Sequence, residues 1–203
     1  MRYNICMFRS TKIIELGSCA FRQPLAESHC RFLHGYRLTA KFWFEANELD
    51  ENNWVVDFGG LKKLKSKMED MFDHTTVISR DDPALPLFED LAKKDIVVLN
   101  VMENGVGIER FAEWCWSTAN DHVQEITNGR CRCVKVEVFE HEKNSAIYEV
   151  GNISVPQLTD KQKEQLTEQV ENINANEGAV VNTNKNKLTN KWVDPKSTNV
   201  WGL

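Results

Sequence analysis

Residues 36–46 carry the pattern that most constrains this chain, a regular alternation of apolar and polar side chains. Polar Arg37, Thr39, Lys41 and Glu45 lie between apolar Tyr36, Leu38, Ala40, Phe42, Phe44 and Ala46. Successive side chains of a β-strand point to opposite faces, so a period of two predicts an antiparallel strand with one buried face. His34 is in phase with the apolar face. Such a strand needs neighbouring strands and a layer that covers its apolar side.

Helical periodicities supply that layer. Residues 108–126 place seven side chains at helical spacing: Ile108, Phe111, Ala112, Cys115, Ala119, Val123 and Ile126. A shorter helix is expected after Asp57, which can cap it, with Phe58, Leu61, Leu64, Met68 and Met71 on one side. We also expect a helix at 84–94.

The remaining strands complete a fold class. A short strand is expected at 96–102, and Val134, Val136 and Val138 alternate with polar residues in a second half-buried strand. The resulting order is β-β-α-(α-β)-α-β-β. It predicts an α+β fold in which helices pack on one face of an antiparallel sheet.

Composition divides the chain near residue 151. All five histidines and all six cysteines precede this point, and the segment after it is rich in Asn, Lys and Thr. We therefore predict a domain over 1–150 and a polar, largely disordered tail over 151–203, with a short helix at 157–172. Trp192 and Trp201 leave two interpretations of the tail open, a segment that docks a protein partner and a loosely attached end.

Charge and hydropathy exclude several classes of protein. A net charge of −5 and a pI near 5.6 argue against a nucleic-acid surface, and the apolar runs are too short to span a membrane. The N-terminus has no signal-peptide pattern, so we expect a cytoplasmic protein with reduced cysteines. The pair Cys131-x-Cys133 could ligate a metal, but no second pair lies nearby, which favours two ordinary core thiols.

Three positions are candidates for chemistry. Glu140 continues the series of Val134, Val136 and Val138, so its carboxylate should end the buried face and need a donor, from the protein or from a ligand. Asp73 and His74 are adjacent, and a carboxylate that orients an imidazole is typical of a proton shuttle. Cys30 can act as a base or nucleophile only where its surroundings lower its pKa.

The order of these segments gives a resemblance. Residues 10–150 resemble the 6-pyruvoyl-tetrahydropterin synthase and 6-carboxy-tetrahydropterin synthase family. The segments that match are SCAFRQ (18–23), CRFLHGY (30–36), NWVVDFGGLK (53–62), FDHTTVI (72–78), GIERFAEWCW (107–116) and VKVEVFEHEKNSAIY (134–148). The spacing of 73–100 looks closer to a less characterised branch.

The resemblance implies a T-fold, whose subunits associate through their sheets into a β-barrel with active sites at subunit boundaries. It implies a lyase that acts on 7,8-dihydroneopterin triphosphate, in queuosine or tetrahydropterin biosynthesis. By the same match, Cys30 moves a side-chain proton, Asp73 and His74 form its relay, and Glu140 anchors the pterin. The next residue is His141, where the family has Thr, and we count it among the substrate-binding candidates.

The family also binds zinc through three histidines, and here the pattern departs. The corresponding positions are Phe21, His34 and Tyr36, so one imidazole remains, whereas a catalytic zinc normally has three protein ligands. Cys19 or His29 could replace the missing ligands. The alternative is a metal-free site in which Tyr36 donates a hydrogen bond.

Three functions follow from this pattern. The first is a pterin lyase of the family. The second is a metal-independent lyase that resembles dihydroneopterin aldolase. The third is a non-catalytic pterin or purine binder, or an assembly protein whose tail recruits a partner. Retention of Cys30, Asp73, His74 and Glu140 favours the first, and the altered zinc positions favour the other two.

Overall fold

The computed structural model describes residues 7–151 of the chain. The predicted helix at 157–172 and the rest of the tail lie outside the described residues. In chain order the elements are β1 (Phe8–Phe21), a 3-10 turn (His29–Arg31), β2 (His34–Ala46), α1 (Lys62–Phe72), β3 (Thr75–Ser79), α2 (Leu85–Lys93), β4 (Leu99–Met102), α3 (Ile108–Ile126), β5 (Cys131–His141) and β6 (Asn144–Glu149).

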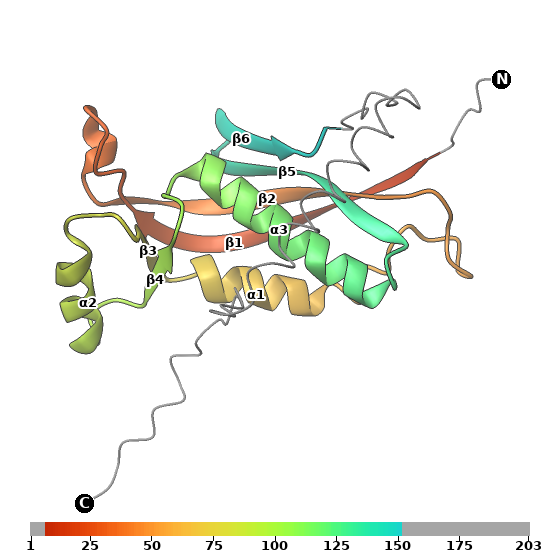
Figure 1. Ribbon diagram of the computed structural model, residues 1–203, viewed down its shortest axis with the longest axis horizontal. Helices are drawn as coiled ribbons and strands as arrows, with labels where there is room; N and C mark the ends of the chain where they lie inside the picture. The colour runs from red at the N-terminus through yellow and green to blue at the C-terminus, as the bar shows by residue number, and fades with distance from the viewer. Residues whose placement is uncertain (1–6, 152–203) are drawn as a thin grey trace, which may run out of the picture. The chain divides into compact units, whose positions relative to one another are not determined.

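The strands form one sheet in the order β4-β3-β1-β2-β5-β6 (Figure 1). β1, β2, β5 and β6 pair antiparallel, as predicted, but β3 pairs parallel with both β1 and β4. The expectation of a wholly antiparallel sheet is therefore wrong, and the sheet is mixed. The sequence pattern missed β3 because all five of its residues are buried and none alternates with a polar surface position.

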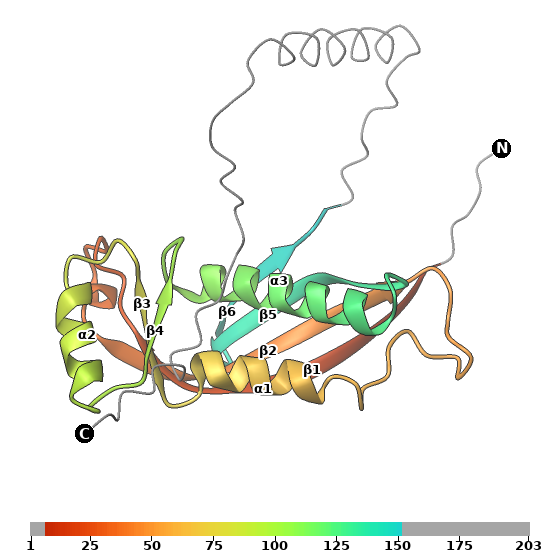
Figure 2. The ribbon, with the colours of Figure 1, turned by 60° about the horizontal axis from the view of Figure 1, so that its bottom comes forward.

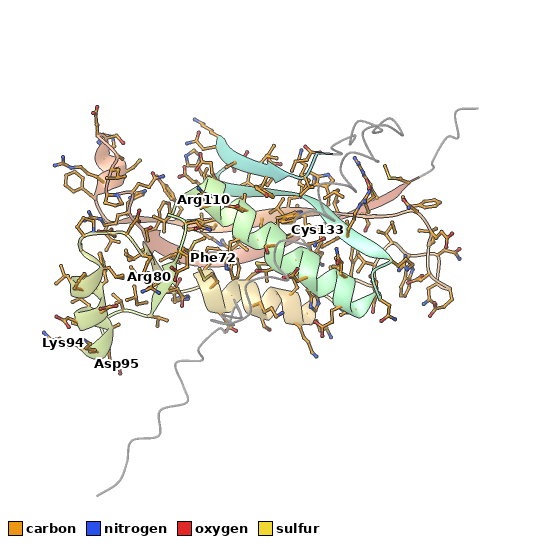
Figure 3. All side chains as sticks on the ribbon, in the orientation of Figure 1. Phe72, Arg80, Lys94, Asp95, Arg110 and Cys133 are labelled. Carbon is orange, nitrogen blue, oxygen red and sulfur yellow. The ribbon has the colours of Figure 1, made fainter. Side chains whose placement is uncertain are left out.

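Helices α1 and α3 cover the same face of the sheet (Figure 2). The apolar stripe of α3 is buried as expected, except that Ile126 is 42% exposed at the last turn. Phe72, labelled in Figure 3 at the end of α1, joins the two helices, since its ring lies 5.0 Å from that of Phe111 and 5.4 Å from that of Trp114. No helix within residues 7–151 is long and apolar enough to cross a membrane.

The start of α1 differs from the prediction. The helix begins at Lys62, and Phe58 is 46% exposed rather than part of the apolar side. Asp57 closes a turn before the helix instead of capping it. Its side chain accepts a hydrogen bond from Gly59 N at 2.8 Å, and its carbonyl accepts one from Gly60 N at 3.1 Å.

Two bulges shift which residues of a strand face the helices. In β1 the pairing with β2 shifts between Glu15 and Gly17, so Leu16 is buried and the buried series then continues at Cys19. In β5 the partners of Trp43 and Phe44 are Lys135 and Cys133, which leaves Val134 as the extra residue. The buried series of β5 therefore changes from odd to even numbers, with Val136 and Val138 buried, and half-buried Glu140 lies at a further irregularity of the pairing with β6, between Phe139 and His141.

The Cys131-x-Cys133 pair lies in the core. Both thiols are buried on the odd-numbered part of β5, and burial raises the pKa of Cys131 to about 11 and that of Cys133 to about 12. Thiolates are the metal-binding form of cysteine, so these side chains act as small apolar residues.

Candidate functional site

One end of the sheet gathers most of the candidate residues (Figure 1). β1 ends there at Phe21 and β2 begins there at His34, and these two residues pair across the strands. The His29–Arg31 turn, the β5–β6 hairpin and the first turn of α3, marked by Arg110 in Figure 3, are close to the same end.

Three rings from β1 and β2 form what we call the aromatic cluster, Phe21, His34 and Tyr36. The centroid of the Phe21 ring lies 4.7 Å from that of His34 and 6.2 Å from that of Tyr36, and the rings of His34 and Tyr36 lie 5.7 Å apart at 83°. Phe21 is 1% exposed and packs edge-on against Phe111 of α3 at 5.0 Å. The structure thus brings together the three positions that match the family's zinc histidines.

The side chains of the aromatic cluster do not fit a zinc site. Phe21 has no donor atom, and His34 supplies the one imidazole, whose Nδ1 lies 2.7 Å from the Phe32 carbonyl oxygen and so donates to it. The replacement ligands do not complete the set. Cys19 is 2% exposed, and burial raises the pKa of its thiol to about 12. Within residues 7–151, no three His, Cys, Asp or Glu side chains gather in an arrangement that could hold a metal, and His29 joins no such group.

Glu140 lies in a cavity beside the aromatic cluster, which we call the Glu140 cavity. Its volume is about 430 Å³, and its lining includes Phe21, Gln23, Gly107, Glu109, Glu140 and Asn144. Glu140 is half-buried, and its hydrogen-bond partner among the described side chains is Asn144, whose Nδ2 lies 3.5 Å from Oε2. A contact of this length is weak, so the carboxylate keeps most of its capacity to accept hydrogen bonds.

Glu109 is a second carboxylate of this cavity, and sequence reasoning missed it. It lies in the first turn of α3, where acidic residues are common because they complement the helix dipole, so its position alone gave no signal. Close packing shapes the wall beside it. Gly107 has a φ of +133°, and a Cβ there would lie 2.6 Å from Gln23 Nε2.

Tyr36 of β2 is close enough to both Glu140 and Cys30 for each to influence its pKa. Burial raises the pKa of the Tyr36 phenol, and the nearby charges of Glu140 and Cys30 raise it further. Cys30 is half-buried in the His29–Arg31 turn, which Ser28 caps by accepting a hydrogen bond from Cys30 N at 3.4 Å. The thiol, the phenol and the carboxylate therefore occupy one neighbourhood, on segments that are 110 residues apart from Cys30 to Glu140.

His141 adds a ring to this neighbourhood. Its side chain lies beside Tyr36, with 6.3 Å between ring centroids and 67° between the ring planes. His141 Nδ1 also accepts a hydrogen bond from Lys143 N at 3.1 Å, which fixes the imidazole in the β5–β6 turn. The residue is exposed, in contrast to Glu140 before it.

The side chains of Asp73 and His74 contact each other just before β3. His74 Nδ1 lies 2.9 Å from Asp73 Oδ1, and the same oxygen accepts a hydrogen bond from Ser18 N at 3.1 Å. That backbone hydrogen bond is the largest influence that lowers the pKa of Asp73, and His74 lowers it further. His74 has a φ of +58°, and its N–H donates to the Ser18 carbonyl at 2.8 Å, so the backbone fixes the pair against the β1 bulge.

This pair faces a second hollow. Its volume is about 420 Å³, and Ser18, Gly35, Tyr36, Arg37 and His74 are among its lining residues. The His74 side chain is 85% exposed there. No hydrogen bond or ion pair within residues 7–151 joins Asp73 or His74 to Cys30. Within the described residues, therefore, the thiol and the Asp73–His74 pair are not hydrogen-bonded to each other, and Tyr36 lines the hollow beside the pair.

Comparisons with known proteins give a consistent result. The family model for 6-pyruvoyl tetrahydropterin synthase matches residues 15–151. A 6-carboxy-5,6,7,8-tetrahydropterin synthase from Rickettsia conorii is 37% identical over 77 residues, which is 37% of this chain and 55% of that protein. The Rickettsia felis enzyme of the same name is 35% identical over the same length. The chain thus matches about half the length of these relatives.

Solved structures show the same fold. An uncharacterized protein from Wolinella succinogenes superposes with a TM-score of 0.63 at 20% identity, over 72% of this chain and 99% of that one. The Caenorhabditis elegans 6-pyruvoyl tetrahydropterin synthase superposes with a TM-score of 0.51 at 17% identity, over 74% and 100%. With a family model that spans about two thirds of its residues, the chain belongs to the 6-pyruvoyl tetrahydropterin synthase family.

Proposed function

We propose that this protein is a lyase that acts on 7,8-dihydroneopterin triphosphate or a closely related pterin. The observation that carries the proposal is the Glu140 cavity, in which the protein engages the Glu140 carboxylate only weakly, and both Glu140 and the Cys30 thiol influence the pKa of the same phenol, Tyr36. Membership of the family supports the reaction class.

The chemistry of the cavity suits one edge of a pterin. That edge carries an amino group and ring N–H groups, which are donors, and an ionised carboxylate only accepts, so one Glu can receive two of these hydrogen bonds at once. Glu109 provides further acceptor atoms in the same cavity, and Phe21 provides an apolar wall. A volume of about 430 Å³ is within the usual range of small-molecule pockets.

The reaction requires that a proton leave the side chain of the substrate. In our proposal Cys30 takes this proton, and His74, oriented by Asp73, accepts and returns it. Asp73 is suited to orient His74 because its lowered pKa keeps it ionised. Since no hydrogen bond or ion pair within residues 7–151 joins the pair to the thiol, we propose that a homo-oligomer brings them together at a subunit interface.

The composition of the aromatic cluster favours a second candidate function. The aromatic cluster lacks the donor atoms of a three-histidine metal site, which suits a metal-independent, aldolase-type pterin lyase or a non-catalytic pterin or purine binder. For all three functions we place the protein in the cytoplasm, in a queuosine or tetrahydropterin pathway.

A product analysis separates these functions. Purified protein is incubated with 7,8-dihydroneopterin triphosphate, and separately with 7,8-dihydroneopterin, and the products are identified by mass spectrometry. Loss of triphosphate with a rearranged side chain supports the proposal, and cleavage of the unphosphorylated compound supports the aldolase-type activity. Binding without turnover supports the binder. No binding of either compound refutes the two lyase activities and the pterin binder, and leaves the purine binder.

A further inference from the structure

We propose that the aromatic cluster replaces a metal centre in this protein, and that the Tyr36 hydroxyl donates a hydrogen bond to the ligand of the Glu140 cavity. The first part stands on the packing of Phe21, His34 and Tyr36 alone. The second part rests on the proposed function.

Phe21 belongs to the core rather than to an open coordination site. Its ring is 1% exposed and lies between His34 at 4.7 Å and Phe111 at 5.0 Å. An imidazole in this apolar setting would bury polar nitrogen atoms that need partners, whereas a phenyl ring needs none. Local packing therefore stabilises the residue that cannot bind a metal.

His34 alone cannot make up for the metal-binding atoms that Phe21 lacks. Its Nδ1 is engaged by the Phe32 carbonyl at 2.7 Å, which leaves Nε2 as a single available ligand atom. A zinc ion bound by one imidazole would depend on water for its other ligands, and such sites do not retain the metal. The donor set thus predicts that this protein does not hold zinc at the aromatic cluster.

Tyr36 is the polar member of the aromatic cluster that can serve a ligand. Three rings fix its orientation, His34 at 5.7 Å, His141 at 6.3 Å and Phe21 at 6.2 Å. A phenol retains its proton at neutral pH and is therefore a hydrogen-bond donor. The Tyr36 ring lies 6.2 Å from that of Phe21, which lines the Glu140 cavity, and in our proposal a ligand oxygen that extends from the cavity accepts the hydrogen bond of the phenol. A donor held in place loses little entropy when the ligand binds.

Metal analysis tests the first part. The full-length protein and the Phe21→His/Tyr36→His variant are loaded with zinc, passed through a desalting column and analysed by inductively coupled plasma mass spectrometry. We expect about one zinc per chain in the variant, which has three imidazoles, and far less than one in the wild type. If the variant does not fold, as judged by circular dichroism, the zinc content of the wild type still shows whether the protein retains zinc.

The His34→Ala variant locates any zinc that the wild type retains. Stoichiometric zinc that disappears in His34→Ala overturns the proposal, because the metal then depends on the aromatic cluster. Zinc that persists in His34→Ala is bound elsewhere, and it supports a cluster without metal.

A binding titration tests the second part. Tyr36→Phe keeps the ring and removes the hydroxyl, so the affinity for 7,8-dihydroneopterin should fall about tenfold, the effect of one hydrogen bond. Unchanged affinity in Tyr36→Phe, with weaker binding in Glu140→Gln, overturns the role of Tyr36 and leaves the proposed function standing. Absence of binding of both 7,8-dihydroneopterin and its triphosphate to the wild type refutes the proposed function and with it the role of Tyr36, and the zinc result remains valid.

Discussion

Replacement of Glu140 by Gln tests the central feature of the site, because it removes the charge and keeps the size of the side chain. The carboxylate has one described side-chain partner, Asn144 at 3.5 Å, so the protein itself loses little. In the proposed complex, the carboxylate accepts two hydrogen bonds from the ligand edge. The amide retains one acceptor and turns an N–H group toward the other donor.

The expected loss follows from these two contacts. A hydrogen bond to a charged group contributes about 1.5–3 kcal/mol, and a mismatched donor adds the cost of an unsatisfied group. Because Glu140 is half-buried, solvent screens part of this energy. We expect a loss of about 2–4 kcal/mol, which corresponds to a dissociation constant that is about 30 to 1,000 times larger.

Isothermal titration calorimetry with 7,8-dihydroneopterin measures this difference. Glu142→Gln is the matched control, since Glu142 is exposed in the same β5–β6 turn and lies outside the cavity lining. Its affinity should equal that of the wild type. If Glu140→Gln binds within about threefold of the wild type, the assignment of Glu140 as the pterin anchor is wrong.

Three further predictions concern catalysis and stability. Cys30→Ala should lower turnover at least about a hundredfold and change ligand affinity little, as expected for loss of a proton-transferring group; normal turnover in product assays would remove the thiol from the mechanism. Gly17→Ala should destabilise the fold by about 1–3 kcal/mol in urea titrations, since φ is +101° and a Cβ would lie 2.1 Å from Asp73 Oδ1. Gly129→Ala, at φ +81° with nothing within 4 Å, is its control, and equal losses in the two variants would contradict this explanation. Burial alone raises the pKa of Glu45, but hydrogen bonds and charges from its two arginine partners outweigh burial and bring the pKa below 4.5. This carboxylate therefore stabilises the fold above the pKa of the unfolded chain and ceases to do so as the pH falls through the folded value. Urea titrations between about pH 3 and 6 should show a smaller pH dependence of stability for Glu45→Gln, and an unchanged dependence would refute the assignment.

The parts of the fold that depend on long local patterns could be predicted from the sequence. The stripe of 108–126 is long enough to give α3 its observed bounds, and the alternation of 36–46 gives the buried face of β2. β3 could not be predicted in the same way, because a short strand buried on both faces shows no periodicity. Without it, the parallel pairs of the sheet were also missed.

Long-range contacts explain the other failures. The alternation placed Glu45 on the polar face of its strand, yet the residue is 1% exposed because Arg9 and Arg132 cover it from neighbouring strands. The strand phase did place Glu140 toward the buried side, although the bulge at Val134 was not foreseen. Glu109 was missed because its partner residues in the cavity come from distant segments.

The displaced register of β1 has a consequence for how this protein can change over time. Before Gly17 the strand contributes even-numbered residues to the interior, and after it odd-numbered ones. The two segments are therefore under different constraints. Packing under the helices constrains Ile14 and Leu16, whereas Phe21 lies at the end of the strand and lines the Glu140 cavity. A substitution at position 21 can thus leave the pairing of β1 before Gly17 unchanged. This offers a physical route by which a phenyl ring could replace a metal-binding side chain while the fold persisted.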